Sequence, residues 1–540
     1  MPESTDVAIV GSGLAGMCAA VAAAEAGARS VTVLERGHGG GASALSGGIV
    51  YAGGGTAQQR EAGFEDSPAD MLAYMRAEVG DSGVVDDATL RRFCDGSAAE
   101  VRWLEGLGAR FSGAAFCRYK TSYPKDGDFL YYSGNEKAAR FAAVARPAPR
   151  GHRAVGGPGM TGGALWRAIF DAAVDKGVRF EAATKVEDVV MDQGRAVGVR
   201  YRRLNPVAAA APFAKHKKLS QRALDLRLAT NTLADWYDKR ASKVFQRHAE
   251  EGTLGAGAVI LAAGGFGLNH AMVKSHYPLA DRLHFLGTAG DDGAGIRLGA
   301  AAGGSTGRMG SVSAWRFLYP PDALLHGVAV GPDGTRIAAE DLYGAAFADR
   351  MVRRHGGRGF LVLDSDQWAR ATAQVAEQTE HLTRFMALYV TRWLRRRAGS
   401  LGALAGRVGV DAVALAGTVA AYNDAIVAGR PDPVGKTDEY RSPIARPPFY
   451  AVDVSLAPSG PYMSTGITLG GLRVEGGSGL VLRGSEGGGE NQAVIAGLYA
   501  AGRTAVGLCS NGYVSGLSLA DCVFSGRRAG GHAARRVLGS

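Results

Sequence analysis

Long apolar runs, paired cysteines and metal-ligand spacings are all missing from this sequence. No apolar stretch reaches the roughly 18 residues that a membrane-spanning helix needs, and no charged leader precedes an apolar signal core. The 5 cysteines are scattered and odd in number, so neither a disulfide framework nor a zinc site is expected. We therefore predict a protein without a bound metal ion that works in the reducing cytoplasm.

A clustered basic region is not evident either, although the formal net charge is +10. Because the 61 basic residues are spread over the chain, we expect no nucleic-acid partner, and peripheral contact with a membrane stays an alternative. The 80 glycines follow no triplet period, which excludes a collagen-like chain, and they interrupt apolar runs. They predict many tight turns and close backbone approaches. A length of 540 residues predicts several domains.

The N-terminal residues 6–36 predict a nucleotide-binding site. They read "DVAIVGSGLAGMCAAVAAAEAGARSVTVLER", which is a strand, a glycine turn, an alanine-rich helix and a second strand. Gly11, Gly13 and Gly16 satisfy the G-x-G-x-x-G pattern, which needs glycine for the turn, for access to a pyrophosphate and for helix packing. Glu35 follows at about the 20-residue spacing expected of an acid that binds a ribose hydroxyl.

The residues after Glu35 favour FAD over NAD. The tract "RGHGGGASALSGGIVYAGGG" places backbone amides and the hydroxyls of Ser43 and Ser46 where an extended cofactor can reach them. A second buried strand, "GAVILAAGGFG" at residues 257–267, also closes on glycines, as a further pass of chain beneath the same cofactor requires. No second nucleotide motif for NAD is evident.

The order of these motifs resembles a known superfamily. "GSGLAG...LER", "GGAS...SGG", "ILAAGGF" and "GLYAAGR" occur in this order in the flavoproteins of the fumarate reductase and succinate dehydrogenase group. Among them the sequence is most similar to the 3-ketosteroid dehydrogenases, especially the 4-dehydrogenase type that acts on 5α-reduced 3-ketosteroids. The resemblance implies an α/β fold, with a split Rossmann-like FAD-binding domain and an inserted α+β cap.

The chain pattern fits this architecture. We predict a first part of the FAD-binding domain at 1–274, a cap at 275–445 that is richer in helix periodicity, and a second part at 446–540. Five prolines between 431 and 448 mark the predicted return from the cap. Residues 204–252 look like a helical insertion, which could be a solvated surface excursion or could contact a membrane, a partner or a second subunit.

The resemblance also assigns positions that bind the cofactor. No histidine lies in "ALSGGIVYAGGG", where members with a covalent flavin carry one, so non-covalent FAD is expected. The implied FAD-binding residues are Gly11, Gly13, Leu14, Ala15, Gly16, Glu35, Arg36, Ala42, Ser43, Ser46, Gly47, Gly48, Val186, Ala262, Ala263, Gly264, Gly502, Arg503, Gly516, Ser518 and Leu519.

The same resemblance identifies candidate catalytic residues. It places "SNGYVSGLSLAD" beside the flavin ring, with a helix beginning near Ser518, and it implies that Tyr513 and Ser515 face the substrate. In the stretch around Glu340, Tyr343 stands where fumarate-reducing relatives carry an arginine, so a dicarboxylate clamp is not expected. Three further residues are predicted to line the substrate pocket: Tyr319, Tyr462 and Gly512.

These residues predict the desaturation of an apolar cyclic ketone, such as a 3-ketosteroid. A phenol can donate a hydrogen bond to a developing enolate or, if its pKa is lowered, remove the α proton. Which of Tyr343 and Tyr513 does which is left open, and Ser515 is expected to relay the proton. The hydride goes to flavin N5, and a quinone or another acceptor reoxidises the flavin. The alternatives are an ene-reductase using the same site, or a basic flavoprotein that docks to a membrane or nucleic acid.

Overall fold

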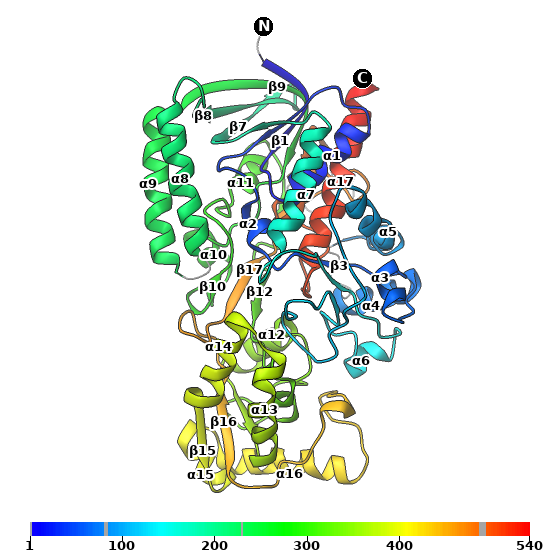
Figure 1. Cartoon of the computed structure of the whole chain (residues 1–540), viewed down its shortest axis with the longest axis vertical. Coiled ribbons are helices and arrows are strands. Elements are labelled where there is room, and N and C mark those ends of the chain that lie inside the picture. The colour runs from blue at the N-terminus through cyan, green and yellow to red at the C-terminus, as the bar shows by residue number, and fades with distance from the viewer. Residues whose placement is uncertain (1–2, 80–84, 228–229, 485–492, 540) are drawn as a thin grey trace.

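The computed structural model describes residues 3–79, 85–227, 230–484 and 493–539 (Figure 1). Its largest element is an eight-stranded sheet in the order β19-β20-β8-β9-β1-β2-β6, with β7 paired to β8. The strands are β1 (Glu3–Val10), β2 (Val31–Leu34), β6 (Arg179–Glu181), β7 (Thr184–Asp192), β8 (Arg195–Arg203), β9 (Glu250–Leu261), β19 (Leu480–Leu482) and β20 (Val494–Ala500). Strands from both ends of the chain therefore share one sheet, as a split domain requires.

The centre of this sheet is parallel and buried. β1 pairs in parallel with β2 and with β9, and the four residues that end β1 are all buried. Continuous apolar runs such as "AIV" suit strands that are covered on both faces. The helices around this core part are α1 (Leu14–Glu25), α2 (Gly41–Leu45), α3 (Ala57–Glu61), α4 (Pro68–Val79), α5 (Asp87–Gly106), α6 (Ala139–Ala142), α7 (Gly162–Asp175), α10 (His270–His276), α11 (Ala294–Ala301) and α17 (Leu517–Leu538).

Helices α1 and α17 lie side by side, so that the first and last helices of the chain close the same core (Figure 1). Glycines in α17 allow this contact. A Cβ added at Gly526 would lie 2.4 Å from the carbonyl oxygen of Ala15, and one at Gly530 would lie 2.1 Å from that of Ala19. The backbones of the two helices therefore pack directly against each other at these glycines, which have no side chain to separate them.

The cap, here residues 328–453, holds a separate antiparallel sheet in the order β13-β14-β16-β15. Its strands are β13 (Val328–Val330), β14 (Phe360–Leu363), β15 (Arg395–Ala398) and β16 (Phe449–Asp453). Its helices are α12 (Gly344–His355), α13 (Ser365–Gln378), α14 (His381–Tyr389), α15 (Leu401–Val408) and α16 (Ala412–Val427). This α+β unit and the split core agree with the fold class that the sequence predicts.

The predicted domain division at 445/446 separates β16 from the strands that bind it. β16 pairs with β14 and with β15, so residues 449–453 are part of the cap sheet. The prolines that guided the division, among them Pro447 and Pro448, lie directly before this strand rather than after it. We therefore propose that the cap ends after Asp453.

Smaller sheets connect the two parts. β17 (Thr465–Thr468) pairs with both β10 (His284–Phe285) and β12 (Val312–Trp315) between the core and the cap (Figure 1). The remaining pairs are β3 (Ile49–Tyr51), β5 (Gly151–Arg153) and β4 (Leu130–Tyr131), and β11 (Thr306–Gly307) with β18 (Gly471–Leu472). These connections bring residues from three distant segments to the boundary between the core and the cap. We call this boundary the seam.

Residues 204–252 contain a helical hairpin, α8 (Ala210–Arg227) and α9 (Asn231–His248), which stands beside the sheet (Figure 1). The hairpin reaches the core through an imidazole contact, because His38 Nε2 lies 2.9 Å from His216 Nδ1. Among the described residues, no helix combines the length and the apolarity needed to cross a bilayer.

The α1–α17 contact predicts opposite effects for two adjacent glycines. Gly530→Ala forces a methyl group against the backbone of α1, so we expect a loss of about 1–3 kcal/mol of stability. Gly531→Ala is the matched control, because its Cβ would meet only the mobile end of Arg535 at 3.3 Å and alanine favours a helix. Thermal unfolding compares the two. Equal melting temperatures would show that the close contact does not constrain the fold.

Candidate active site

Three glycines at the end of β1 form the first wall of a cleft. Gly11 has φ +100°, and a Cβ there would lie 2.6 Å from the carbonyl oxygen of Ala262. A Cβ at Gly16 would lie 2.0 Å from the carbonyl oxygen of Gly11. The fold itself therefore requires both glycines. Gly13 has φ −61° and meets only Ser43 Oγ, at 3.5 Å, so the fold leaves its exposed side free for the close approach of a ligand.

The start of α1 and the end of β2 supply the polar groups of this wall. The Leu14 N–H donates to Ser43 Oγ at 3.0 Å, and a helix N-terminus of this kind favours phosphate. The Glu35 carboxylate accepts from Ser12 N at 2.9 Å, from Ser12 Oγ at 2.7 Å and from Gly37 N at 2.6 Å. These bonds fix the position of the acid, whose role in binding a ribose stays a prediction.

A buried ion pair forms the opposite wall. Arg503 Nη2 lies 2.6 Å from Asp291 Oδ1, and the same carboxylate accepts from Thr288 N at 2.8 Å and from Gly265 N at 3.2 Å. The other terminal nitrogen, Arg503 Nη1, is buried without a hydrogen-bond partner in the described part of the chain. An unpartnered guanidinium donor in a cleft suits an anionic or carbonyl-rich ligand. The cleft therefore fits FAD.

Most of the predicted cofactor positions line this cleft. They are Gly11, Gly13, Leu14, Ala15, Glu35, Arg36, Ala42, Ser43, Val186, Ala262, Ala263, Gly264 and Arg503. The structure adds lining residues that the sequence did not indicate: Val10, Ser12, Leu34, Gly41, Thr184, Lys185, Thr288, Gly290, Asp291, Ala294, Leu298, Ala501 and Cys522. Asp291 had a weak signal, an acid within "TAGDDGAG", whereas the apolar residues had none.

The other predicted cofactor positions lie around the cleft, and their role stays a prediction: Gly16, Ser46, Gly47, Gly48, Gly502, Gly516, Ser518 and Leu519. Several make close backbone contacts. The Gly47 carbonyl accepts from Tyr123 OH at 3.0 Å, and a Cβ at Gly516 would lie 2.7 Å from Ile49. They shape the chain beneath the seam with the cap.

Aromatic side chains from three segments meet at this seam. The Tyr343 and Tyr513 ring centroids are 6.2 Å apart, and Tyr513 stacks on Trp315 at 5.3 Å. Phe317 lies 5.2 Å from Tyr343 and 5.8 Å from Tyr319. The structure thus brings the predicted tyrosines of the cap and of the C-terminal loop into one buried cluster.

Hydroxyl groups beside this cluster are joined by hydrogen bonds. Tyr131 OH donates to Ser515 Oγ at 2.9 Å, inside the protein. Burial raises the pKa of Tyr343 well above its usual value, the neighbouring tyrosines raise it further, and a hydrogen bond with Ser515 opposes the shift. Tyr131 was not predicted, and its only signal was its place in the aromatic stretch "LYYSG". Tyr319 is also buried, and its hydroxyl has no hydrogen-bond partner among the described residues.

Tyr513 connects the aromatic cluster to the cleft. Burial raises its pKa and the nearby Cys509 adds to this, whereas the Arg503 charge and the Gly516 N–H act in the opposite direction. Arg503 therefore influences both the cofactor cleft and the phenol.

Tyr462 and Gly512 occupy packing positions near the cluster. Tyr462 OH donates to the carbonyl of Phe317 at 2.7 Å, and its ring lies under the Arg316 guanidinium at 4.2 Å. A Cβ at Gly512 would lie 2.9 Å from the carbonyl oxygen of Glu78. Their role in a substrate pocket stays a prediction, since these contacts explain both residues without a ligand.

The amide of Asn135 holds Tyr343 in place. Its Oδ1 accepts from the Tyr343 N–H at 2.6 Å, and its Nδ2 donates to both Glu78 oxygens at 3.0 and 3.1 Å. Burial raises the pKa of Glu78 to about 7, and Asn135 opposes this rise. The core side chain of Asn135 therefore fixes the backbone of Tyr343 in the cap. The sequence indicated neither Asn135 nor Glu78.

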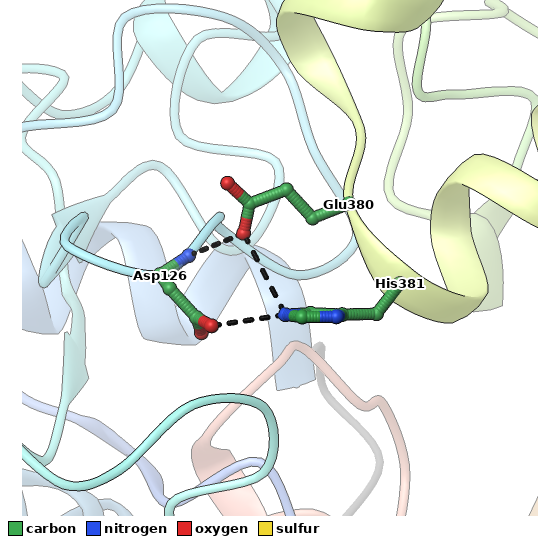
Figure 2. A group of neighbouring side chains, drawn as sticks. All are labelled: Asp126, Glu380 and His381. Carbon is green, nitrogen blue, oxygen red and sulfur yellow. Dashed lines mark hydrogen bonds and ion pairs between the residues drawn. The ribbon is translucent and has the colours of Figure 1, made fainter.

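A second polar contact joins the cap to the core at the start of α14. Figure 2 shows His381 directed toward Asp126, with His381 Nε2 3.0 Å from Asp126 Oδ2 and Asp126 N 3.0 Å from Glu380 Oε2. This is the group of carboxylates and imidazole in the described residues that could hold a metal ion. Because Asp126 is also paired with Arg153 at 2.8 Å, we interpret the group as a contact between the two parts.

Residues 6–516 match the model of the FAD binding domain family. The chain belongs to this family. This FAD binding domain protein is 33% identical over 515 residues to a 3-oxo-5-alpha-steroid 4-dehydrogenase of Comamonas testosteroni, covering 93% of this chain and 92% of the relative. It is similar in structure to a 3-ketosteroid-delta4-(5alpha)-dehydrogenase from Rhodococcus jostii in complex with 4-androstene-3,17-dione, with a TM-score of 0.79, 30% identity, and coverage of 98% and 97%.

A more distant relative is named as a reductase. A probable fumarate reductase of Shewanella frigidimarina is 24% identical over 546 residues, covering 99% of this chain and 76% of the relative. Family membership confirms the predicted cofactor, FAD, and the predicted class, an FAD-dependent oxidoreductase. It also confirms the resemblance to the ketosteroid dehydrogenases.

The pKa of Glu78 predicts a pH-dependent stability. Because the folded-state pKa of about 7 lies above the ordinary value of 4.5, the stability from this proton is present below about 4.5 and is lost as the pH rises through about 7. Glu78→Gln keeps an acceptor for Asn135 and stays neutral. We expect the melting temperature of this variant to fall less between pH 5 and pH 8 than that of wild type.

The matched control is Glu65→Gln, at a carboxyl whose side chain is 84% exposed. This variant should keep the wild-type pH dependence. An unchanged pH dependence in Glu78→Gln would mean that this carboxyl is already ionised in the folded protein at pH 5.

Proposed function

We propose that this protein desaturates an apolar cyclic ketone next to its carbonyl group, and that a 3-ketosteroid is the natural substrate. The observation that carries the proposal is the meeting of Tyr343 from the cap and Tyr513 from the core, with Ser515 beside them. The two ketosteroid dehydrogenase relatives support the steroid class.

The reaction removes a proton from the α carbon and a hydride from the β carbon. FAD, when bound, accepts the hydride. Burial raises the pKa of both phenols, but at Tyr513 the Arg503 charge and the Gly516 N–H oppose the rise. We therefore assign proton removal to Tyr513, the phenol whose ionised form has a cation beside it. We assign the stabilisation of the developing enolate to Tyr343, since neighbouring phenols and burial keep its pKa high and its hydroxyl protonated.

We propose that Ser515 passes the proton on. Tyr131 already donates to Ser515 Oγ at 2.9 Å, so the Ser515 hydrogen is free for another acceptor. Phenols and hydroxyls suit this task because none of them buries a permanent charge beside an apolar ring system. The unpartnered Tyr319 hydroxyl offers a further donor to a ketone.

We propose that substrate binding moves the cap. The Tyr343 ring lies 5.2 Å from Phe317 and 6.2 Å from Tyr513, so a polycyclic ketone that entered between these rings would have to separate them. We propose that the cap opens at this seam and that the steroid replaces these ring contacts with its own apolar surface. The Asn135 bond to the Tyr343 N–H then restores the catalytic geometry when the cap closes.

Reduction of a dicarboxylate is a weaker alternative. It needs free cationic donors at the seam, and the buried Arg316 uses both terminal nitrogens elsewhere, donating to the carbonyls of Tyr462 at 2.8 Å and Ser455 at 2.7 Å. Only its Nε lacks a partner among the described residues. We also propose that FAD is held without a covalent bond, that a quinone or a similar acceptor reoxidises it, and that the enzyme is cytoplasmic.

The direct test is anaerobic reduction of the flavin by candidate substrates. We expect a saturated 5α-reduced 3-ketosteroid to bleach the flavin absorbance and to yield the α,β-unsaturated ketone. Succinate is the matched control and should leave the flavin oxidised. Bleaching by succinate without bleaching by any saturated ketone would assign the site to dicarboxylates.

A further inference from the structure

The cap carries an apolar stripe that faces solvent. Leu382 is 57%, Phe385 52% and Trp393 65% exposed. These residues lie on α14 and on the turn of π-helix, Val390–Leu394, that continues it. Their spacing, with Tyr389 between Phe385 and Trp393, places them along one side of the helix. The rings of Tyr389 and Trp393 are 6.2 Å apart, which makes the stripe continuous.

Helix α14 and the turn after it direct their large apolar side chains toward solvent, which is unusual. Ala387, Val390 and Thr391 are buried on its inner side, so small residues face the cap while the large apolar ones face outward. A surface helix normally turns its large apolar side chains to the core. An exposed apolar patch of this kind marks an interaction surface.

Arginines accompany the stripe along the chain. Residues 381–410 contain six arginines and no aspartate or glutamate, which corrects the expectation that basic residues are evenly spread. They are Arg384, Arg392, Arg395, Arg396, Arg397 and Arg407. The three central arginines lie on β15, an edge strand that pairs with β16, and all three are exposed. The strand therefore presents its charges beside the apolar stripe.

We propose that α14, the following π-helical turn and β15 form a surface that binds an anionic lipid bilayer. Leu382, Phe385 and Trp393 enter the headgroup region, and the arginines contact lipid phosphates. The α8–α9 hairpin, which the sequence suggested for such a role, is less suited. Its exposed Trp236 already has a partner on one ring face, the Arg240 guanidinium at 3.7 Å from the ring centroid, and Arg227 is paired with Asp235 at 2.6 Å.

Charge also argues against a second copy of the chain as the occupant. A symmetric dimer through this stripe would place one set of arginines opposite the other, with no acidic residue of 381–410 to separate them. A bilayer with anionic lipids instead complements both the charge and the apolar side chains. The stripe begins at the contact of Figure 2, beside the seam between cap and core.

The test is sedimentation of the FAD-loaded protein with phosphatidylcholine vesicles, with and without phosphatidylglycerol. We expect wild type to bind the anionic vesicles, and Phe385→Ser combined with Trp393→Ser to bind at least about tenfold more weakly. Arg396→Gln should weaken binding by about fivefold. Trp236→Ser is the matched control, since it removes an exposed tryptophan elsewhere, and should bind as wild type does.

Three outcomes would overturn the proposal. Wild type does not bind anionic vesicles, the double variant binds them as well as wild type, or light scattering shows a wild-type dimer that the double variant loses. FAD content and circular dichroism confirm that the variants fold. The inference does not rest on the proposed reaction, because flavin reduction by a ketone in solution should be the same in wild type and the double variant.

Discussion

The buried ion pair between Arg503 and Asp291 is the interaction on which both halves of the site depend. It joins the end of β20 to the loop before α11, and Asp291 also binds two backbone N–H groups. Removing one partner of such a pair leaves an uncompensated charge and typically costs about 3–5 kcal/mol. Because Arg503 faces the cofactor cleft and also opposes the rise that burial causes in the pKa of Tyr513, one buried charge relates the position of the cofactor to the proposed base.

The cofactor cleft and the seam carry different kinds of polar groups. The cleft in the core carries charged and backbone groups that suit a phosphate-rich cofactor, such as the α1 N-terminus and Glu35. The seam itself carries neutral hydroxyls among aromatic rings. An apolar ketone can therefore react next to a charged cofactor without having an ionised side chain in its own pocket. Asn135 adds the connection between the two, because it binds the backbone of Tyr343 across the seam.

The cofactor cleft could be predicted from local sequence patterns. The aromatic cluster at the seam could not, because it arises from packing between segments far apart in the sequence. Gly11 and Gly16 were readable because a turn and a close helix approach need glycine at fixed spacings. Tyr343 and Tyr513 came from resemblance alone, since residues 170 positions apart carry no local sign of meeting. Tyr131, Asn135 and Glu78 were missed for the same reason, since their roles arise from contacts across separate segments. The predicted edge of the cap relied on prolines, which mark a turn, whereas our proposed edge after Asp453 relies on the strand pairing of β16, which prolines do not indicate.

The central claim is that Tyr343 and Tyr513 act as one unit across the seam. The most direct measurement is a double-mutant cycle of Tyr343→Phe and Tyr513→Phe, read by anaerobic stopped-flow reduction of the flavin with a saturated ketone. Loss of a positioned acid or base costs about 10² to 10⁴ in rate, and loss of an oxyanion donor about 10² to 10³. The account predicts losses in these ranges, with the double variant losing less than the product of the two. Tyr499→Phe, whose hydroxyl lies 3.0 Å from His532 Nδ1, is the control and should react as wild type does. Near wild-type flavin reduction in Tyr513→Phe would contradict the account and make this tyrosine a packing residue.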